Sequence, residues 1–531
     1  MTKNASIDEQ WAARFANLLG WEDRRARGAY RGSVSVLSDP AEVLTPDEMA
    51  QADAMAIAGG TSGLVLMENA GRAVAEAVRR ELPPGARISV MTGPGNNGGD
   101  GFIAARLLAE AGYAVRVGAL AARERLTGDA AFAAAAWKGP TKSLSPEIAD
   151  DTDLIIDALF GAGLDRPIDG LAAQTIQAVN RSGVPVFAID LPSGINGLTG
   201  QVMGSAIEAD ESVTFFRPKP GHLLQPGRRH VGRLTVADIG IPSSCLDVIL
   251  PRTWRNTPAR WSLPPLTVDQ NKYTHGHAVV VSGPATRTGA ARLAARAALR
   301  VGAGLVTVAS PLDALAANAA QLTAIMLLPM EGAPGLSAIL ADERRNAVVI
   351  GPALGLDKGA VDLVGAALGS PAGVVLDADA LTAYTGKGDL LFNIIKGRSA
   401  SVVLTPHEGE FKRLFPELSE KESKLERARS AAEKSGAVVI LKGPDTVVAA
   451  PNGHAFIADN APPQLATAGS GDVLAGMVGG LLAQGMPAFQ AAAAAVWLHG
   501  EAGLAKGRGL IAEDLPDVLP AVFTELTNRS R

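Results

Sequence analysis

The sequence predicts an α/β protein with two different parallel-sheet domains. From Val43 to Ala237, apolar runs of strand length alternate with alanine-rich stretches of helical length, and a second alternation begins at Ala278. Such alternation is typical of parallel sheets with helices on their faces. The segment between the blocks is rich in proline, which favours a connection between domains. The 531 residues are thus expected to form an extension at 1–41, a first domain at 42–240, a linker at 241–269 and a second domain at 270–531.

Four apolar runs in the first block have the length of buried strands. Each leads into a turn that contains glycine or aspartate, and open α/β sheets bind their ligands at these carboxyl ends of strands. The expected strands are Ile88–Met91, Ala114–Ala119, Leu154–Ile156 and Val184–Ile189.

The turn after the first strand is GPGNNGGDG, at Gly93–Gly101, and the helical pattern FIAARLLAEAG follows it. Glycines in this position let backbone N–H groups approach an anion such as a phosphate. The alternative is a plain surface turn, which the strand before it and the amphipathic helix after it disfavour. Asn96, Asn97 and Asp100 add oxygen atoms that suit a cation or sugar hydroxyls.

Two further turns in this block carry carboxylates. In DALFGAGLDRP, Asp157 follows the third expected strand, and in AIDLPSG, Asp190 and Ser193 follow the fourth. A single aspartate at such a place can simply cap a helix. Three polar turns at one edge of one sheet instead predict a phosphate cradle with oxygen ligands and carboxylates that transfer protons, without a histidine or a thiol nucleophile.

The motifs of the first block are VLTPDEMAQAD, LMENAGRAVAEA, GPGNNGGDG, DALFGAG, DLPSG and FFRPKPGH. Over about Val43–Ala237 they resemble the NAD(P)H-hydrate epimerase domain. The resemblance implies a Rossmann-like, three-layer α/β/α domain that interconverts the R and S forms of hydrated NADH and NADPH (NADHX and NADPHX). It also implies potassium at Asn97, Asp157 and Ser193, and proton transfer by Asp157 or Asp190. The hydrated nucleotide is expected at Asn96, Asn97, Gly98, Gly99, Asp100, Gly161, Ala162, Gly163, Leu164, Asp165, Arg166, Pro167 and Asp190.

The second block contains six expected strands, with helices between most of them. In ATAGSGDVLAGMVGGLL, Gly469, Gly471 and Asp472 begin a helix of small residues. N–H groups and the dipole at a helix N-terminus stabilise a phosphoryl group in transfer, and an aspartate there can accept the proton of an attacking hydroxyl. The alternative is a glycine-lined seam between packed helices. The expected strands are Ala278–Ser282, Leu305–Ala309, Ala347–Ile350, Gly373–Leu376, Ala400–Leu404 and Ala437–Leu441.

Two other turns in the second block suit a nucleotide. LKGPDT places Lys442, Gly443 and Thr446 between two strands, where they can grip adenosine and its phosphates, although a basic hairpin is the plainer interpretation. In LTPHEGE, His407 offers an imidazole to a ligand at the end of a strand. Glu410, three residues on, offers a carboxylate to a hydrated Mg²⁺.

The motifs GPALG, VVLDADAL, LTPHEGE, LKGPDT, AGSGDVLAG and WLHGEAG follow one another over about Asn271–Val522. They resemble the ribokinase-like superfamily and, more closely, the ADP-dependent NAD(P)H-hydrate dehydratase. The resemblance implies that Asp472 assists the C6 hydroxyl of the S hydrate in attacking the β-phosphoryl of ADP, after which the ring nitrogen expels phosphate and leaves NAD(P)H and AMP. The entry segment NKYTHGH departs from the family's usual His-Lys-Gly. The hydrate is expected at Ala291 (or Ala290), Gly355, His407 and Asp472, and the adenine nucleotide at Lys442, Gly443, Pro444, Asp445, Thr446 and Gly471.

Composition and charge exclude several other classes of protein. The formal net charge of −5 argues against nucleic acid as a partner. The chain has no apolar run of bilayer length, and its polar N-terminus lacks a signal-peptide core, so neither a membrane partner nor export is expected. Cys245 is the single cysteine and cannot form an internal disulfide, which favours the reducing cytoplasm. Residues 1–41 show only a short helical pattern at Trp11–Leu19.

Both resemblances lead to the same damaged cofactor, because the first domain would supply the epimer that the second one consumes. The expected function is therefore metabolite repair with ADP, Mg²⁺ and K⁺, and the family resemblance implies a homo-oligomer. The alternative is a ribokinase-like kinase of a vitamin-like alcohol, with a nucleotide-binding regulatory domain in front of it. A third hypothesis makes the first domain a non-catalytic binding module.

Overall fold

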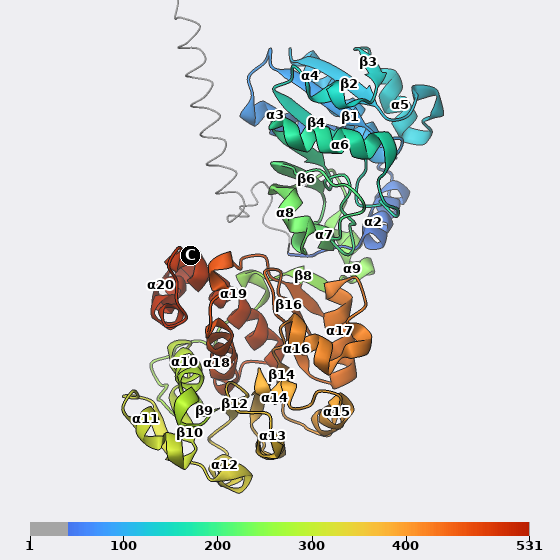
Figure 1. Cartoon of the computed structure of the whole chain (residues 1–531). Coiled ribbons are helices and arrows are strands. Elements are labelled where there is room, and N and C mark those ends of the chain that lie inside the picture. The colour runs from blue at the N-terminus through green and yellow to red at the C-terminus, as the bar shows by residue number, and fades with distance from the viewer. Residues whose placement is uncertain (1–40, 530–531) are drawn as a thin grey trace, which may run out of the picture. The chain divides into compact units, whose positions relative to one another are not determined.

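The computed structural model describes residues 41–529 (Figure 1). The chain divides into two compact units, the first ending at Pro251 and the second beginning at Arg252, within the segment 241–269. The predicted helical pattern at Trp11–Leu19 lies outside the described residues. None of the helices within 41–529 is both long enough and apolar enough to cross a membrane.

The segment 241–269 contributes to both units. Ile241 and Cys245 pack in a hydrophobic core of the first unit. Thr253–Arg255 forms strand β8, which pairs with a strand of the second unit, and Trp261 packs in the core of that unit.

The first unit is built on a parallel sheet of seven strands, which confirms the predicted sheet type. β1 and β4 are neighbours at its centre, where the strand order reverses, and doubly wound sheets bind ligands at such a point. The sequence predicts four of these strands within two residues of their observed bounds, and misses β3, β6 and β7. In spatial order the strands are β3 (Thr141–Ser143), β2 (Ala114–Ala119), β1 (Arg87–Thr92), β4 (Leu154–Ala158), β5 (Val186–Ile189), β6 (Glu211–Phe215) and β7 (Arg233–Ala237).

Helices cover both faces of this sheet, as the three-layer prediction requires. Successive residues of a strand point to opposite faces. In β1, Ile88 and Val90 pack in a core with α2 to α5, whereas Met91 packs in a second core with α6. The helices are α2 (Pro46–Ala58), α3 (Gly63–Glu81), α4 (Asn96–Glu110), α5 (Gly128–Ala136), α6 (Gly170–Ser182), α7 (Pro220–Leu223), α8 (Gly227–Val231) and α9 (Leu246–Ile249).

The predicted glycine-rich turn is shorter than expected, because α4 already begins at Asn96. A Cβ atom at Gly98 would lie 2.0 Å from the carbonyl oxygen of Gly93, and one at Gly101 would lie 2.5 Å from the Cβ of Ala158. These two glycines therefore let α4 pack closely on the sheet. The prediction of a loop as far as Gly101 is wrong, and only Gly93–Gly95 precede the helix.

The second unit is built on a ten-stranded sheet. The seven strands β9 to β15 pair in parallel, as predicted. The pairs β15–β16 and β16–β17 are antiparallel. The LKGPDT turn lies between β15 and β16, which confirms its placement between two strands. In spatial order the strands are β11 (Met326–Pro329), β10 (Leu305–Ser310), β9 (His277–Val281), β12 (Ala347–Ile350), β13 (Gly373–Leu376), β14 (Val402–Leu404), β15 (Val438–Leu441), β16 (Val447–Ala449), β17 (Ala455–Ile457) and β8 (Thr253–Arg255).

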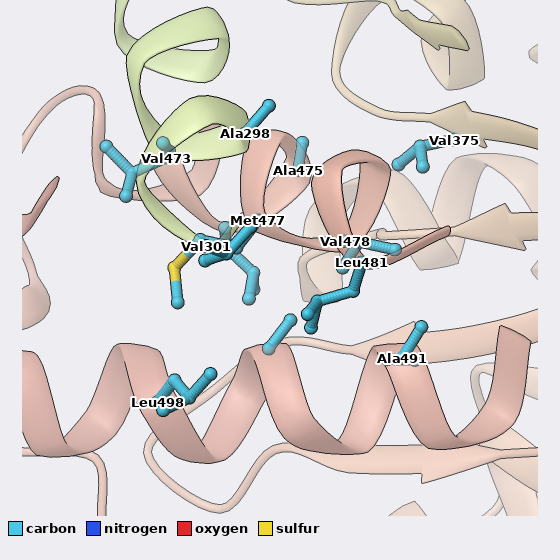
Figure 2. Close-up of a cluster of buried hydrophobic side chains, with 14 of the residues drawn as sticks. Ala298, Val301, Val375, Val473, Ala475, Met477, Val478, Leu481, Ala491 and Leu498 are labelled. Atoms are coloured by element: carbon cyan, nitrogen blue, oxygen red, sulfur yellow. The ribbon is translucent and has the colours of Figure 1, made fainter. Parts of the chain in front are cut away.

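A large alanine-rich core lies between this sheet and the helices α10, α18 and α19. Figure 2 shows side chains of the three helices and of Val375 on β13 within one cluster, among them Ala298, Met477 and Leu498. The helices of the unit are α10 (Gly289–Arg300), α11 (Leu315–Ala319), α12 (Gly332–Leu340), α13 (Lys358–Gly369), α14 (Asp379–Thr382), α15 (Gly388–Lys396), α16 (Glu408–Leu414), α17 (Lys424–Ser435), α18 (Ser470–Ala483), α19 (Ala488–Lys506) and α20 (Asp514–Arg529).

Gly476 on α18 sets the distance between α18 and α10, because a Cβ there would lie 2.1 Å from the carbonyl oxygen of Ala294. We expect Gly476→Ala to lower the free energy of unfolding of the second unit by about 1–3 kcal/mol through overpacking. Gly365→Ala on α13 is the matched control, since nothing lies within 4 Å of its Cβ, and there we expect a gain of about 0.5–1 kcal/mol. Calorimetric unfolding measures both variants, and equal effects would contradict this role of Gly476.

Candidate active sites

Polar residues of the first unit gather at the carboxyl ends of β1, β4 and β5. These strands are parallel and adjacent, so their ends meet at one edge of the sheet. Thr92 ends β1, Asp157 is the fourth residue of β4, and Asp190 directly follows β5. The sequence places Asp157 just after its strand, whereas the structure places it within the strand, with its carboxylate fully buried.

Asp157 and Ser193 form a buried cluster of oxygen atoms. The Ser193 hydroxyl donates to Asp157 Oδ1 at 2.7 Å, and the backbone N–H of Ser193 donates to Oδ2 at 2.8 Å. The carbonyl oxygen of Phe160 lies 3.2 Å from Ser193 Oγ. Three oxygen-bearing groups, one from β4 and one each from the turns after β4 and β5, therefore lie together.

This cluster fits a monovalent cation. The hydrogen-bond donors to Asp157 in the described part of the chain are neutral groups of Ser193 and Leu159. Burial raises the pKa of Asp157 to about 6, against the opposing effect of those hydrogen bonds. A cation beside the carboxylate would offset the cost of burying its charge.

The side chains of Asn97 and Asp190 both end close to Gly161. A Cβ at Gly161 would lie 3.1 Å from both Asn97 Oδ1 and Asp190 Oδ2, so only glycine leaves this space open. Among residues 41–529, none makes a hydrogen bond to the buried atoms Asn97 Nδ2 and Thr92 Oγ1. Buried polar atoms of this kind suit a polar ligand or a water molecule.

A buried lysine and a histidine, neither of them among the predicted site residues, hold Asp190 in place. Lys219 Nζ donates to Asp190 Oδ1 at 2.7 Å, and the backbone N–H of Ala162 donates to Oδ2 at 3.1 Å. His222 Nε2 lies 2.7 Å from the carbonyl oxygen of Asp190, so this nitrogen is the donor. Burial lowers the pKa of His222 to about 4, which keeps the ring neutral.

The carboxyl groups near this site titrate at different pH values. Burial raises the pKa of Asp190, but Lys219 and His222 outweigh it and bring this pKa down to about 2. Burial together with Asp190 and Asp53 raises the pKa of Asp100 well above its usual value. The pKa values of Asp190 and Asp100 thus move in opposite directions, and such a separation is what distinguishes a base from an acid within one site.

The other expected residues of the first site divide into three groups. Ala162 lies beside Asp190, as its hydrogen bond shows. Gly98 and Gly99 are buried against neighbouring elements, and a Cβ at Gly99 would lie 2.6 Å from the sulfur of Met67. The remaining members are exposed or half-buried and make none of these contacts: Asn96, Gly163, Leu164, Asp165, Arg166 and Pro167.

In the second unit, polar residues gather at the ends of β13, β14 and β15. Asp377 directly follows β13 and is buried, and it accepts hydrogen bonds from Thr405 Oγ1 at 2.6 Å and Lys442 Nζ at 2.8 Å. The sequence pattern predicts Lys442 as a site residue but not Asp377, although Asp377 lies in the motif VVLDADAL. Position directly after a buried strand was the signal that could have identified this aspartate.

Asp472 lies half-buried in the first turn of α18, as the sequence predicts. Burial and the nearby Asp377 raise its pKa, Lys442 opposes both, and together they bring this pKa to about 6. A Cβ at Gly471 would lie 3.4 Å from Lys442 Nζ. The structure therefore brings Lys442, Gly471 and Asp472 together at the N-terminus of this helix. Such a site suits an anion beside a general base.

His499 contacts both the carbonyl oxygen and the hydroxyl group of the neighbouring residue, Ser470. His499 Nε2 lies 3.0 Å from the carbonyl oxygen of Ser470 and 3.1 Å from its hydroxyl oxygen. Burial lowers the pKa of His499 to about 4, so the neutral ring donates to that carbonyl. The motif WLHGEAG, which contains His499, thus orients the start of α18.

The turn Lys442–Thr446 is closed by its own hydrogen bonds. The Thr446 hydroxyl donates to the carbonyl oxygen of Gly443 at 2.8 Å, and the N–H of Gly443 donates back to Thr446 Oγ1 at 3.2 Å. The backbone N–H of Lys442 donates to the carbonyl oxygen of Pro406 at 2.9 Å. Asp445 is buried and accepts a hydrogen bond from Lys424 Nζ at 2.6 Å.

His407 and Glu410 cap α16 and bind each other. The N–H of His407 donates to Glu410 Oε2 at 2.9 Å, and His407 Nδ1 accepts hydrogen bonds from Gly409 and Glu410. His407 Nε2 lies 3.3 Å from Glu410 Oε1. Both oxygens of the Glu410 carboxylate thus have a partner in His407, and a contact of Glu410 with a hydrated Mg²⁺ stays a prediction.

The last two expected residues of the second site differ in their surroundings. The N–H of Gly355 donates to Asp379 Oδ2 at 2.9 Å, which holds the GPALG turn against α14. Ala291 lies in the first turn of α10 with its methyl group in the hydrophobic core, whereas Ala290 is half-buried. Only the backbone of Ala291 is therefore available to a ligand.

Within residues 41–529, no three or more His, Cys, Asp or Glu side chains are arranged to hold a metal ion. Such groups hold transition metals or bind cations through several acidic side chains, whereas the Asp157–Ser193 cluster offers a mixed set of oxygen atoms.

Two family models match the chain. The model described as the N-terminus of YjeF-related proteins matches residues 63–221, and the model described as NAD(P)H-hydrate dehydratase matches residues 278–519. The two matches fall in different units, which agrees with the division of the fold at Pro251 and Arg252.

Curated relatives match nearly the whole chain. The bifunctional NAD(P)H-hydrate repair enzyme Nnr of Moorella thermoacetica is 38% identical over 523 residues, which cover 91% of this chain and 97% of the relative. The enzyme of the same name from Thermofilum pendens is 36% identical over 470 residues, covering 84% and 88%. Among solved structures, the ADP/ATP-dependent NAD(P)H-hydrate dehydratase from Bacillus subtilis is 30% identical, with a TM-score of 0.43 over 50% of this chain and 94% of that chain.

Proposed function

Because the chain belongs to the family of bifunctional NAD(P)H-hydrate repair enzymes, we propose that its first unit interconverts the R and S forms of NADHX and NADPHX and that its second unit dehydrates the S form with ADP. The single observation that carries the second activity is Asp472 at the N-terminus of α18, with Lys442 beside it. The first activity rests on Asp190 and Asn97, whose side-chain oxygen atoms both lie close to Gly161.

In the second unit, Asp472 accepts the proton of the C6 hydroxyl group of the S hydrate. The hydroxyl oxygen attacks the β-phosphorus of ADP, the bond from that phosphorus to the bridging oxygen breaks, and AMP leaves. Lys442 and the N–H groups at the start of α18 stabilise the negative charge of the phosphoryl oxygens. The mechanism is that of a kinase applied to a ring alcohol.

Phosphorylation converts a poor leaving group into a good one. The lone pair of the ring nitrogen expels phosphate from C6, and loss of a proton from C5 restores the ring double bond. The products are NADH or NADPH, AMP and phosphate, so the water of hydration leaves as part of the phosphate.

In the first unit, inversion at C6 requires the bond from C6 to its oxygen to break and to form again on the other face, or the ring to open and close. Both routes pass through a positively charged or strongly polar ring. Asp190, ionised through Lys219, stabilises that charge, and Asp190 or Asp157 moves the proton.

Potassium would be held by Asp157, Ser193 and Asn97. When bound, it supplies a positive charge that compensates the buried Asp157 carboxylate. Asp157 then stays ionised at neutral pH, and Ser193 keeps the turns after β4 and β5 together through its two contacts with Asp157.

The reaction products distinguish this function from that of a kinase that acts on a vitamin-like alcohol. With the S form of NADHX and ADP, we expect one AMP and one phosphate for each NADH formed, measured by chromatography. A kinase would instead consume ATP and leave a stable phosphorylated alcohol. Accumulation of such an alcohol, without free phosphate, would refute the proposal for the second unit.

The dehydration should depend on pH through Asp472. A general base acts only when ionised, and the pKa of Asp472 is raised to about 6 by burial and by Asp377. We therefore expect kcat/KM of the dehydration to fall as the pH drops below about 6 and to level off above it. Asp377→Asn removes a negative charge, so this acid limb should move to lower pH. An acid limb that stays in place in that variant would contradict Asp472 as the base.

A further inference from the structure

Lys424 occupies an unusual position for a lysine. It is the first residue of α17, where the helix dipole disfavours a positive charge, and it is only 7% exposed. A buried ammonium group is costly unless a carboxylate compensates it. Lysine is rarely found fully buried without such a partner.

The compensating partner lies inside the turn Lys442–Thr446. Lys424 Nζ donates to Asp445 Oδ1 at 2.6 Å and to the carbonyl oxygen of Lys442 at 3.3 Å. The side chains of Lys424 and Asp445 are 8% and 6% exposed, so this is a buried ion pair. Glu408 Oε1 lies farther from the ammonium group, at 3.9 Å.

The backbone of the turn passes close to this ammonium group at Gly443. A Cβ at Gly443 would lie 2.4 Å from Lys424 Nζ and 3.0 Å from Asp445 Oδ1. Any side chain at position 443 would therefore displace the ammonium group or open the turn.

Lys424 binds the backbone of the turn, not the side chain that reaches α18. The carbonyl group of Lys442 is bound by Lys424, while the side chain of Lys442 extends toward Asp377 and the N-terminus of α18. The backbone position from which Lys442 reaches the phosphoryl site is thus held by Lys424.

We propose that Lys424 is a positioning residue for the adenine nucleotide, which holds the turn Lys442–Thr446 in its binding conformation without touching the nucleotide itself. This inference rests on the proposed function, in which that turn binds ADP. It adds to the site a residue from α17 that lies 18 positions before Lys442 in the sequence.

The test compares Lys424→Met, which keeps the length of the side chain but removes its charge, with Lys424→Arg, which keeps the charge. Lys434→Met in the last turn of the same helix is the matched control, since Lys434 pairs with Glu417 at the surface. The full chain is assayed for KM of ADP, KM of the S form of NADHX and kcat, and calorimetry measures ADP binding directly.

We expect Lys424→Met to raise the KM and the Kd of ADP by about tenfold or more, because small displacements of a positioned group have effects of this size. The KM of the hydrate should stay within about twofold, and Lys424→Arg should recover most of the ADP affinity. Lys434→Met should behave as the wild type. Wild-type ADP affinity in Lys424→Met overturns the proposal, and so does a loss of kcat alone with both KM values unchanged.

Two further variants keep the outcome decisive. If Lys424→Met does not fold, the double variant Lys424→Met with Asp445→Asn removes both buried charges, and it should show the same weakening of ADP binding. Lys442→Met tests the underlying function. If its ADP affinity equals that of the wild type, the turn is not the nucleotide site, and the proposed function fails independently of Lys424.

Discussion

Replacing Asp472 with asparagine should lower kcat for dehydration of the S hydrate by about 10²–10⁴-fold, which is the usual contribution of a positioned general base. The substitution keeps the size of the side chain and the start of α18, so ADP should still bind. The measurement is the rate of NADH formation from the S hydrate at saturating ADP, together with calorimetric binding of ADP.

Asp517→Asn is the control for this variant. Asp517 is exposed on α20 and pairs with Arg296, which is not among the residues placed in the site around Asp472. Its dehydration rate should equal that of the wild type. A wild-type kcat in Asp472→Asn would show that another group accepts the hydroxyl proton.

Replacing Asp157 with asparagine should abolish enzymatic interchange of the R and S forms, leaving only the spontaneous rate. The variant loses the negative charge of the buried oxygen cluster and can no longer accept both hydrogen bonds from Ser193. Interchange is followed by chromatography of a single purified epimer without ADP, so that the second unit is inactive. Omission of K⁺ should slow the wild type but leave the variant unchanged.

Asp153→Asn provides the comparison. Asp153 directly precedes β4 at the opposite end of that strand and pairs with Arg87 at the surface. This variant should interconvert the epimers at the wild-type rate. Should Asp157→Asn do the same, the first unit would be better described as a binding module.

Local patterns were enough to predict the architecture. Apolar runs bounded by glycine or aspartate gave the central strands, because a buried parallel strand must be apolar along its whole length. The edge strand β3 and the strand β6 were missed, since Thr141–Ser143 is short and polar and Glu211–Phe215 carries polar residues that the fold buries. Their strand character depends on tertiary neighbours, which a local pattern does not contain.

Residues at strand ends and at helix N-termini were predictable for the same reason. Asp157, Asp190, Lys442 and Asp472 follow directly from their positions in the motifs. Their partners were not identified: Lys219 lies in the motif FFRPKPGH, but neither Lys219 nor Lys424 has a local pattern that predicts its burial. Only the fold shows that each is buried against a carboxylate of its site.

The glycine motifs required the structure for a different reason. A glycine that leaves room for a ligand and one that lets two backbones approach look the same in a sequence. Gly161 leaves a space between Asn97 and Asp190, whereas Gly98 and Gly476 are packed against carbonyl oxygens.

The central claim is that both units act on one pool of hydrated cofactor. The most direct test mixes the wild-type protein with NADHX containing both epimers, ADP, Mg²⁺ and K⁺, and follows the absorbance of the reduced nicotinamide ring, with Asp157→Asn as the measure of spontaneous interchange. The account predicts an ADP-dependent rise that continues past the share of the S epimer until all hydrate is consumed, faster than in the variant. The account is contradicted if the rise slows to the rate of the variant once the S epimer is consumed. It is also contradicted if no ADP-dependent rise occurs.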